Sequence, residues 1–111
     1  MPTSNSNGSQ TATVTTEHII GNGGAAITDV ATFVLGVDTS NMALIDELIL
    51  RVYVKVRSTG TTRLVYSASY AHVQSIPVKL SIPVPSTNEI KFTLEQTAGT
   101  GRAFPWEIWE L

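Results

Sequence analysis

Hydrophobic and polar residues alternate most regularly in residues 48–57 (LILRVYVKVR). A period of two is the pattern of a β-strand with one face in a core and the other toward solvent. A helix over residues 42–52 is an alternative, because the apolar residues Ile45, Leu48 and Val52 also fit helical spacing. The β-branched valines in the second half of the pattern favour the strand.

A hairpin is predicted to follow this strand, because residues 58–62 (STGTT) are turn formers. If the hairpin centres on Gly60, the apolar positions of the first strand meet mostly apolar partners in the second. We therefore expect this hairpin at the centre of the fold. The predicted pairs are Leu48 with His72, Leu50 with Tyr70, Val52 with Ala68, Val54 with Tyr66, and Val56 with Leu64.

Shorter strand patterns occur along the rest of the chain, at residues 11–20, 30–37, 90–95 and 104–111. The tripeptide Ile-Pro-Val occurs twice within residues 76–84. Because proline lacks an amide donor, this stretch is expected at a sheet edge or in an extended connection. Together the patterns predict an all-β fold, an antiparallel β-sandwich or jelly-roll-like fold of roughly six or seven strands, with little or no helix.

The length of 111 residues suits a single domain. Residues 1–10 (MPTSNSNGSQ) carry almost nothing that could enter a core. We predict that they form a polar N-terminal arm, disordered on its own and held by a neighbouring subunit. Residues 11–111 are predicted to form the single β-sandwich domain.

Composition limits the classes of partner. Charged residues make up 14% of the chain and the net charge is −2, which argues against a general nucleic-acid binder. Cysteine is missing, so disulfides and thiolate chemistry are excluded. No stretch approaches the ~18 apolar residues of a membrane span, and the N-terminus lacks the apolar run of a classical signal peptide.

Catalytic and metal-ligating patterns are missing from the sequence. His18 and His72 lie in different predicted strands without ligand-like neighbours, and we expect both to be structural. Asp46 and Glu47 are adjacent, so in a strand they would point to opposite faces. No GxSxG, HExxH or P-loop pattern occurs. We expect a protein that is not an enzyme and needs no cofactor or metal; a pocket that gathers His72 with two carboxylates would reverse this expectation.

A basic row, Arg51, Lys55, Arg57 and Arg63, occupies the predicted outer face of the hairpin. The predicted register places Arg57 opposite Arg63, and like charges in that position are destabilising unless an anionic group compensates. The row is therefore either a solvated surface or a contact for an acidic partner.

Two tryptophans stand three residues apart, so in a regular strand Trp106 and Trp109 face opposite sides. One can fill the core while the other lies at an interface or forms a sugar-stacking platform; alternatively, both are buried. The residues predicted to form an interface are Ser4, Asn5, Tyr53, Arg57, Arg63, Phe104, Trp106 and Trp109.

The carboxyl-terminal part of the chain also carries several short motifs. They are residues 60–63 (GTTR), 66–68 (YSA), 83–85 (PVP) and 96–102 (QTAGTGR), followed by Pro105-Trp106. Over residues 30–111 the chain resembles small tailed-bacteriophage virion structural proteins. The resemblance implies a head decoration, fibre or tail-fibre component that is assembled in the host cytoplasm and located in the virion. It also implies contacts with other virion subunits, such as a major capsid or tail protein, and a homo-oligomer, typically a trimer.

The alternative function is a carbohydrate- or receptor-binding β-sandwich module, such as a tail-fibre adhesin. It predicts an exposed aromatic row beside polar loops and saturable binding of a glycan. Neither function predicts contact with nucleic acid or a membrane.

Overall fold

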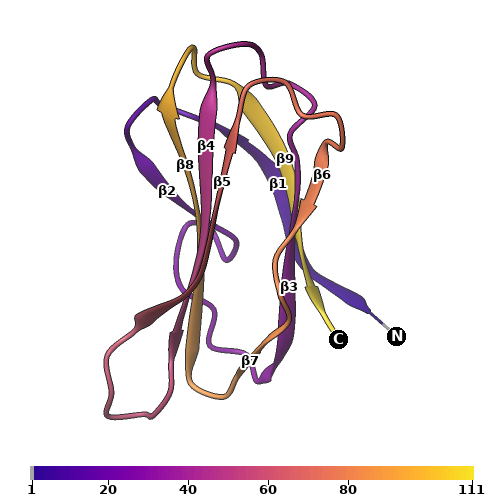
Figure 1. The fold of residues 1–111 in the computed structure, drawn as a ribbon. Helices are drawn as coiled ribbons and strands as arrows, with labels where there is room; N and C mark the ends of the chain where they lie inside the picture. Colours follow the sequence, from indigo (N-terminus) through magenta and orange to yellow (C-terminus); the bar gives the residue numbers. More distant parts are fainter. Residues whose placement is uncertain (1) are drawn as a thin grey trace.

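Nine β-strands make up the regular structure of residues 2–111, the part of the chain that the computed structural model describes, and no helix occurs among them (Figure 1). All strand pairs are antiparallel. The strands are β1 (Thr3–Thr11), β2 (Glu17–Ile20), β3 (Ala31–Asp38), β4 (Glu47–Lys55), β5 (Arg63–Ala71), β6 (Val78–Leu80), β7 (Val84–Ser86), β8 (Glu89–Ala98) and β9 (Ala103–Glu110).

The strands form two antiparallel sheets that enclose one core, as in a β-sandwich, which confirms the all-β, antiparallel part of the predicted fold class. Sheet A has the order β1-β9-β3-β6, and β7 also pairs with β3. Sheet B has the order β2-β8-β4-β5. The prediction of six or seven strands was too low, because the polar N-terminal segment supplies β1 and the proline-rich segment supplies both β6 and β7.

The predicted hairpin is present as β4 and β5, but its register differs from the prediction by two residues. Leu48 pairs with Tyr70 and Leu50 with Ala68, because the turn centres on Thr59 rather than Gly60. From Leu48 to Val52 this shift of two residues leaves the side chains on their predicted faces. Beyond the bulge at Val65 the shift is three residues, so Arg63 and Leu64 lie on the faces opposite to those predicted. Arg63 lies opposite Val54, so the predicted pair of opposing arginines does not form.

The helical alternative for residues 42–52 is wrong. The chain turns at residues 44–45, where Ile45 has a φ of 74°, and β4 begins at Glu47. A positive φ cannot continue a right-handed helix. The strand beyond it runs at the centre of sheet B, with β5 on one side and β8 on the other.

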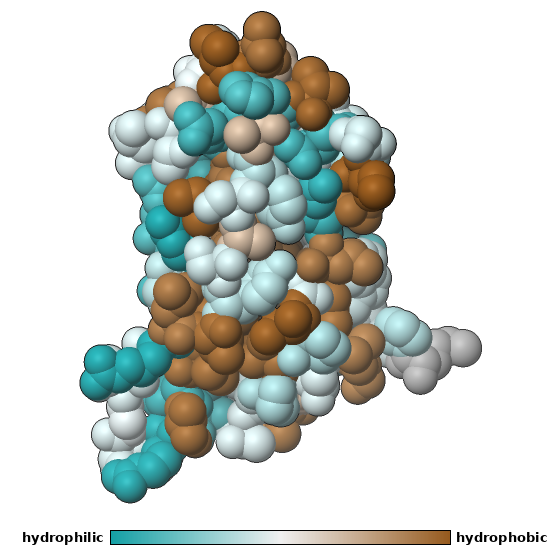
Figure 2. All heavy atoms as spheres, viewed as in Figure 1, coloured by the Kyte–Doolittle hydropathy of each residue, from teal (hydrophilic) through white to brown (hydrophobic). Residues whose placement is uncertain are grey.

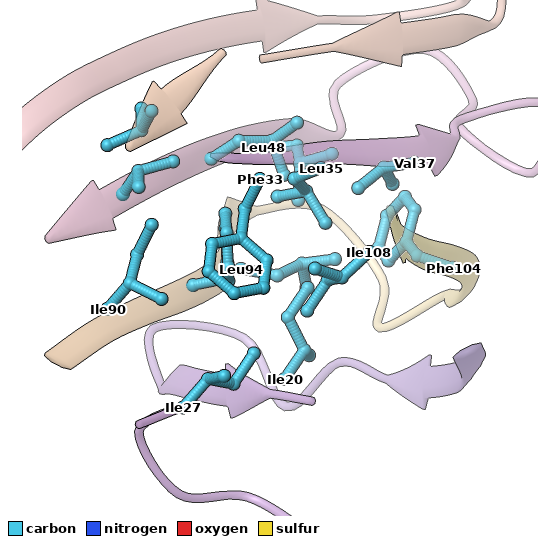
Figure 3. Close-up of a cluster of buried hydrophobic side chains, with 14 of the residues drawn as sticks. Ile20, Ile27, Phe33, Leu35, Val37, Leu48, Ile90, Leu94, Phe104 and Ile108 are labelled. Atoms are coloured by element: carbon cyan, nitrogen blue, oxygen red, sulfur yellow. The ribbon is translucent and has the colours of Figure 1, made fainter. Parts of the chain in front are cut away.

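Apolar side chains from both sheets form one core between them (Figure 3). Phe33 of sheet A meets Phe92 of sheet B edge to face, with ring centroids 6.3 Å apart. Both rings are almost completely buried, and burying each contributes roughly 1.5–3 kcal/mol. The chain therefore closes its sandwich by packing alone, without a disulfide.

The N-terminal segment is not a disordered arm. Residues 3–11 form β1, which pairs along its whole length with β9 at the edge of sheet A, so the predicted boundary at residue 10 falls inside a strand. Backbone hydrogen bonds hold this polar strand, and they do not require apolar side chains. One indole contact adds to them, because the ring of Trp106 packs above Gly8.

The proline-rich segment lies at the other edge of sheet A, as predicted. Its two strands, β6 and β7, have three residues each and pair with different ends of β3. Pro77, Pro83 and Pro85 have no backbone N–H to donate to a neighbouring strand, so this segment cannot form one continuous edge strand.

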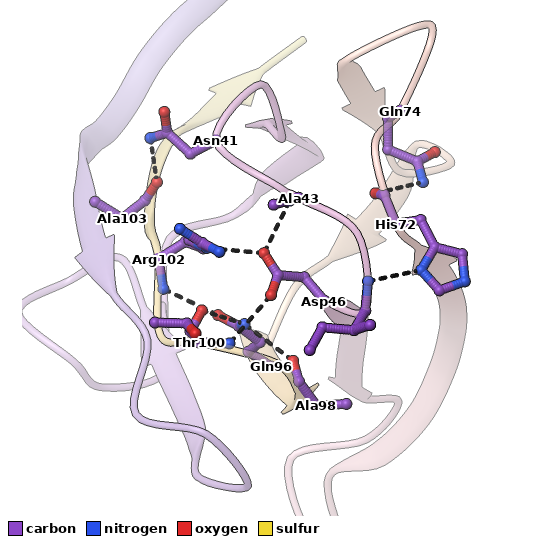
Figure 4. Close-up of polar contacts among 11 residues, drawn as sticks. Asn41, Ala43, Asp46, His72, Gln74, Gln96, Ala98, Thr100, Arg102 and Ala103 are labelled. Carbon is purple, nitrogen blue, oxygen red and sulfur yellow. Dashed lines mark hydrogen bonds and ion pairs between the residues drawn. The ribbon is translucent and has the colours of Figure 1, made fainter.

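A buried polar cluster around Asp46 ties together the loops at one end of the sandwich (Figure 4). The Asp46 carboxylate is fully buried and accepts hydrogen bonds from Ala43 N–H (2.9 Å), Thr100 N–H (3.1 Å) and Arg102 Nε (2.8 Å). Gln96, also fully buried, donates to the carbonyls of Ala98 and Thr100 and accepts from Arg102 N–H. These bonds make the cluster complete without a ligand.

Glycine is required beside this carboxylate. Gly99 has a φ of 89°, and a Cβ at this position would collide with Asp46. In the Gly-Thr-Gly segment, Gly99 therefore lets the backbone pass close to the buried Asp46 carboxylate.

The pKa of the Asp46 carboxyl is lowered in the folded protein. Burial alone would raise this pKa, but the hydrogen bonds from Ala43, Arg102 and Thr100 and the charge of Arg102 outweigh it. Because the pKa is lower in the folded than in the unfolded protein, ionised Asp46 stabilises the fold. This contribution is fully present at pH values above the unfolded pKa. It is lost as the pH falls through the folded pKa.

The variant Asp46→Asn should reduce the free energy of unfolding by roughly 2–4 kcal/mol at pH 7, because the charged acceptor of three hydrogen bonds is lost. The free energy of unfolding of this variant should also fall less steeply than that of the wild type as the pH drops below about 4. Urea unfolding at pH 7 and pH 3 measures both effects. The exposed Asp29→Asn is the matched control. Its one side-chain hydrogen bond, from Asn5, can still be accepted by an amide oxygen, so this variant should unfold nearly like the wild type. Equal curves for the two variants would contradict this role of Asp46.

Candidate functional site

The predicted interface residues of β9 lie on different faces of sheet A. Phe104 is completely buried in the core and Trp106 packs against that core, so the prediction that Phe104 contacts a partner is wrong. Trp109 lies on the outer face, directly across from Ser4 of β1. Asn5 donates to Asp29 and Glu110 and serves within the fold. Of the predicted set, the structure brings together Trp109 and Ser4.

The position of Trp109 depends on Gly36. The six-membered ring of Trp109 occupies the space above this glycine, and a Cβ at Gly36 would overlap it. The Leu80 side chain closes the same position from β6. Gly36 has an ordinary backbone conformation, so glycine is needed here for space and not for its φ.

A shallow hollow of about 490 Å³ opens beside Trp109 on the outer face of sheet A. Three of the polar residues around it, Asn7, Asp38 and Glu107, come from β1, β3 and β9 respectively. Asn7 pairs with Glu107 and Glu107 with Gly36, so these three positions form one row across the sheet. Trp106 also lines the hollow, which thus combines two indoles with two carboxylates and an amide.

A second, smaller hollow of about 210 Å³ lies on the other side of Trp109 and is lined only by apolar surface. Leu80 and Leu111 border it and are each more than half exposed. The indole of Trp109 therefore separates a polar hollow from an apolar one.

The outer face of sheet B has a different character, because most of its charged side chains form ion pairs with one another. Arg51 bridges Glu95 (2.7 Å) and Glu17 (3.4 Å), and Glu17 also accepts from Tyr53 Oη (2.7 Å) and Thr93 Oγ1 (2.6 Å). Burial opposes ionisation of Glu17, yet the hydrogen bonds from Thr93 and Tyr53 and the Arg51 charge lower its pKa.

Tyr53, a predicted interface residue, belongs to this network. Burial and its hydrogen bond to Glu17 raise the pKa of the Tyr53 hydroxyl, and Lys91 Nζ lies 4.5 Å from its ring centroid. Lys55 pairs with Glu89 at 3.1 Å. At Arg51 and Lys55 the predicted basic face is thus a solvated surface on which acidic side chains neutralise the basic ones.

The free edge of sheet B is β5, a strand of nine residues. The sheet A strands that face it, β6 and β7, are too short to cover it, so Tyr66, Ala68 and Tyr70 on its inner side are only partly buried. Lys79 of β6 reaches across to the ring of Tyr70 at 4.9 Å. Burial and the neighbouring Tyr66 raise the pKa of Tyr70 to about 12, so its hydroxyl stays protonated.

Apolar surface continues from this edge toward the β4–β5 turn. A hollow of about 360 Å³ is lined by Val54, Val56, Val65 and Val84 among others, and Val56 is 79% exposed. Figure 2 shows hydrophobic surface gathered in the lower half of this face, beside the protruding hairpin. Arg57 and Arg63 flank the turn and make no ion pair with any residue in 2–111.

Both histidines accept backbone hydrogen bonds, as expected for structural residues. His18 Nε2 accepts from Thr13 N–H at 3.0 Å, and His72 Nδ1 accepts from Ile45 N–H at 2.9 Å. The described residues contain no cluster of three or more side chains suited to a metal ion. They also contain no helix long and apolar enough to cross a membrane.

Sequence reasoning missed the polar row beside Trp109 and the exposed edge at β5. The row comes from three strands distant in sequence, and only the sheet order makes them neighbours. The edge had a local signal, the uncharged run from residue 64 to 71, but the strand order was needed to see that it is free. Comparisons with protein-family models, curated proteins and solved structures found no match.

The variant Gly36→Ala should displace the indole of Trp109 and shift its fluorescence emission to longer wavelength, because the added methyl group takes the space of the ring. The chain has two tryptophans, so the measurement is made in a Trp106→Phe background, where Trp109 alone emits. Gly60→Ala, at the hairpin turn, is the control. Unchanged emission in the Gly36→Ala protein would show that Gly36 does not fix the ring.

Proposed function

We propose that this protein is a non-enzymatic structural component of a virion, a capsid decoration or fibre subunit, which assembles by pairing β5 with a strand of a neighbouring copy. The observation that carries the proposal is the free, uncharged edge of β5. The resemblance of residues 30–111 to phage virion proteins supplies the biological context. A jelly-roll-like connectivity remains a prediction from the sequence.

An exposed edge strand presents a row of unpaired backbone donors and acceptors, which another strand can satisfy. Proteins that stay monomeric usually block such an edge with charged side chains, proline or a cover. Residues 64–71 (LVYSASYA) contain neither charge nor proline. A bulge lies near Val65, but the stretch from Tyr66 to Ala71 pairs regularly with β4 and leaves its other side open.

The other edges are less suited to this contact. β2 has four residues and β6 has three, so each offers a short ladder. β1 is as long as β5, but its sequence TSNSNGSQT is polar and includes a glycine, which weakens a strand. The edge at β5 alone combines length with neighbouring apolar surface.

The apolar hollow next to β5 adds a place for a side chain of the incoming strand. Val65 is 42% exposed and Val56 79% exposed, and Val84 forms the buried floor. Covering this surface would remove apolar area from water at about 25 cal/mol per Å². Strand pairing and side-chain burial would therefore act together, as in other cases of strand addition.

The neighbour that we propose is a second copy of this chain, because the resemblance implies a homo-oligomer. Arg63 stands at one end of β5, and the exposed Glu47 stands beside Ala71 at the other end. Arg63 pairs with Val54, which packs against the core, whereas Glu47 lies on the outer face, so these two charges point to opposite sides of the sheet. The contact therefore rests on strand pairing and apolar burial.

The double variant Ser67→Lys/Ser69→Lys should convert an oligomer into a monomer of 11.9 kDa, because lysine on an edge strand opposes pairing. Both serines are exposed, so the fold should persist. Light scattering after size exclusion, at about 100 μM protein (a concentration well above a micromolar dissociation constant), measures the native mass.

Ser4→Lys/Ser9→Lys on β1 is the matched control, because it places the same charges on two exposed serines of an edge strand of equal length. It should leave the native mass unchanged. A wild-type protein that is monomeric at this concentration, or dissociation by the β1 variant alone, would contradict the proposed contact.

A further inference from the structure

We propose that the outer face of sheet A binds a neutral glycan, with one sugar ring seated against Trp109 and its hydroxyl groups bonded to Glu107, Asp38 and Asn7. This binding site is separate from the strand contact at β5 and does not depend on it. It assigns a ligand to the larger hollow beside Trp109, which is lined by β1, β3 and β9.

The hollow is amphipathic in the same way as a sugar ring. A pyranose has a face of C–H groups and a rim of hydroxyl groups. The indole of Trp109 offers an apolar aromatic surface to such a face, and an aromatic ring attracts C–H groups at its π-surface. Pro105 and Val78 extend the apolar part of the wall.

Acceptors for the hydroxyl groups stand next to the indole. Glu107 lies two positions before Trp109 on β9 and therefore on the same face of the strand. Asn7 pairs directly with Glu107 across to β1. The Glu107 carboxylate and the Asn7 amide make no side-chain hydrogen bond or ion pair among the described residues, whereas Asp38 uses one oxygen for Ser40 N–H. Hydroxyl groups of a ligand can satisfy these acceptors with charge-assisted bonds.

Gly36 links the polar row to Trp109. It lies in the same row as Asn7 and Glu107 and lines the hollow, and the six-membered ring of Trp109 occupies the space above it. Any larger residue at position 36 would meet both Trp109 and Leu80. One glycine therefore fixes the position of the indole wall beside the polar row.

The charges select among ligands. Two carboxylates repel anionic sugars and phosphate groups, which leaves neutral glycans and cations as candidates. Cations such as quaternary ammonium groups are recognised in cages of several aromatic rings. The indoles of Trp106 and Trp109 line an open hollow and do not form a closed cage. The Asn7 amide beside them both donates and accepts hydrogen bonds, which suits a ring with several hydroxyl groups better.

Nuclear magnetic resonance tests this site on the unmodified protein, because its two tryptophans give two indole N–H signals. The probes are glucose, galactose, mannose and N-acetylglucosamine with their disaccharides, and choline as the cationic probe. Trp106 lines the same hollow, so the reference is the set of backbone amide signals of β5 on sheet B. We expect at least one sugar to move the Trp109 signal saturably while the β5 amide signals stay in place. The dissociation constant should be on the order of 1 mM for a ligand of about a dozen heavy atoms.

Glu107→Gln should weaken that binding roughly tenfold, because a neutral amide replaces a charged acceptor of nearly the same shape. Glu47→Gln, an exposed carboxylate on sheet B, is the matched control and should bind like the wild type. The proposal is overturned if no sugar moves the Trp109 signal at 50 mM (about 50 times the expected constant), if Glu107→Gln binds equally well, or if only choline binds. The native mass is recorded for each variant, so failure of this site is distinguished from failure of the β5 contact.

Discussion

The proline-rich segment at residues 76–86 is the constraint from which the exposed surfaces of this protein follow. Three prolines remove backbone donors, so sheet A ends in the short strands β6 and β7. The edge of sheet B is β5, which is three times as long as either of them. The inner side of β5 therefore stays partly uncovered, with Lys79 as one bridge across the gap. A free edge and an apolar hollow lie along one side of the molecule as a consequence. The nearby β4–β5 turn carries Arg57 and Arg63, which form no ion pair with any residue in 2–111.

The two outer faces divide the remaining chemistry between them. On sheet B, Arg51 lies between Glu17 and Glu95 and Lys55 pairs with Glu89, so these five charges are paired within the fold. On sheet A, Gly36 leaves space for Trp109 to lie across it beside carboxylates without ion pairs. The ion pairs on sheet B and the hollow on sheet A suit the protein to bind a ligand on the outer face of sheet A, if it assembles through the edge at β5 as proposed.

The alternation in residues 48–57 predicted the central strand and its buried face, and the two-residue error in register left that face unchanged. The sandwich class and the edge position of the prolines also followed from local patterns. β1 could not be predicted, because a polar strand held by backbone bonds leaves no hydrophobic signal. The burial of Phe104 and the outward position of the half-buried Trp109 required the sheet order, since both residues belong to one strand with apolar side chains on each face.

Hydrogen–deuterium exchange of the β5 amides tests the central claim, that this edge is the contact between subunits, most directly. Peptides covering residues 63–71 are compared between dilute and concentrated wild-type protein, with peptides of β1 as the internal reference. The account predicts that exchange in β5 slows as the concentration rises while exchange in β1 does not change, because only β5 gains hydrogen-bond partners on assembly. Exchange in β5 that is independent of concentration, or slowing confined to β1, would contradict it.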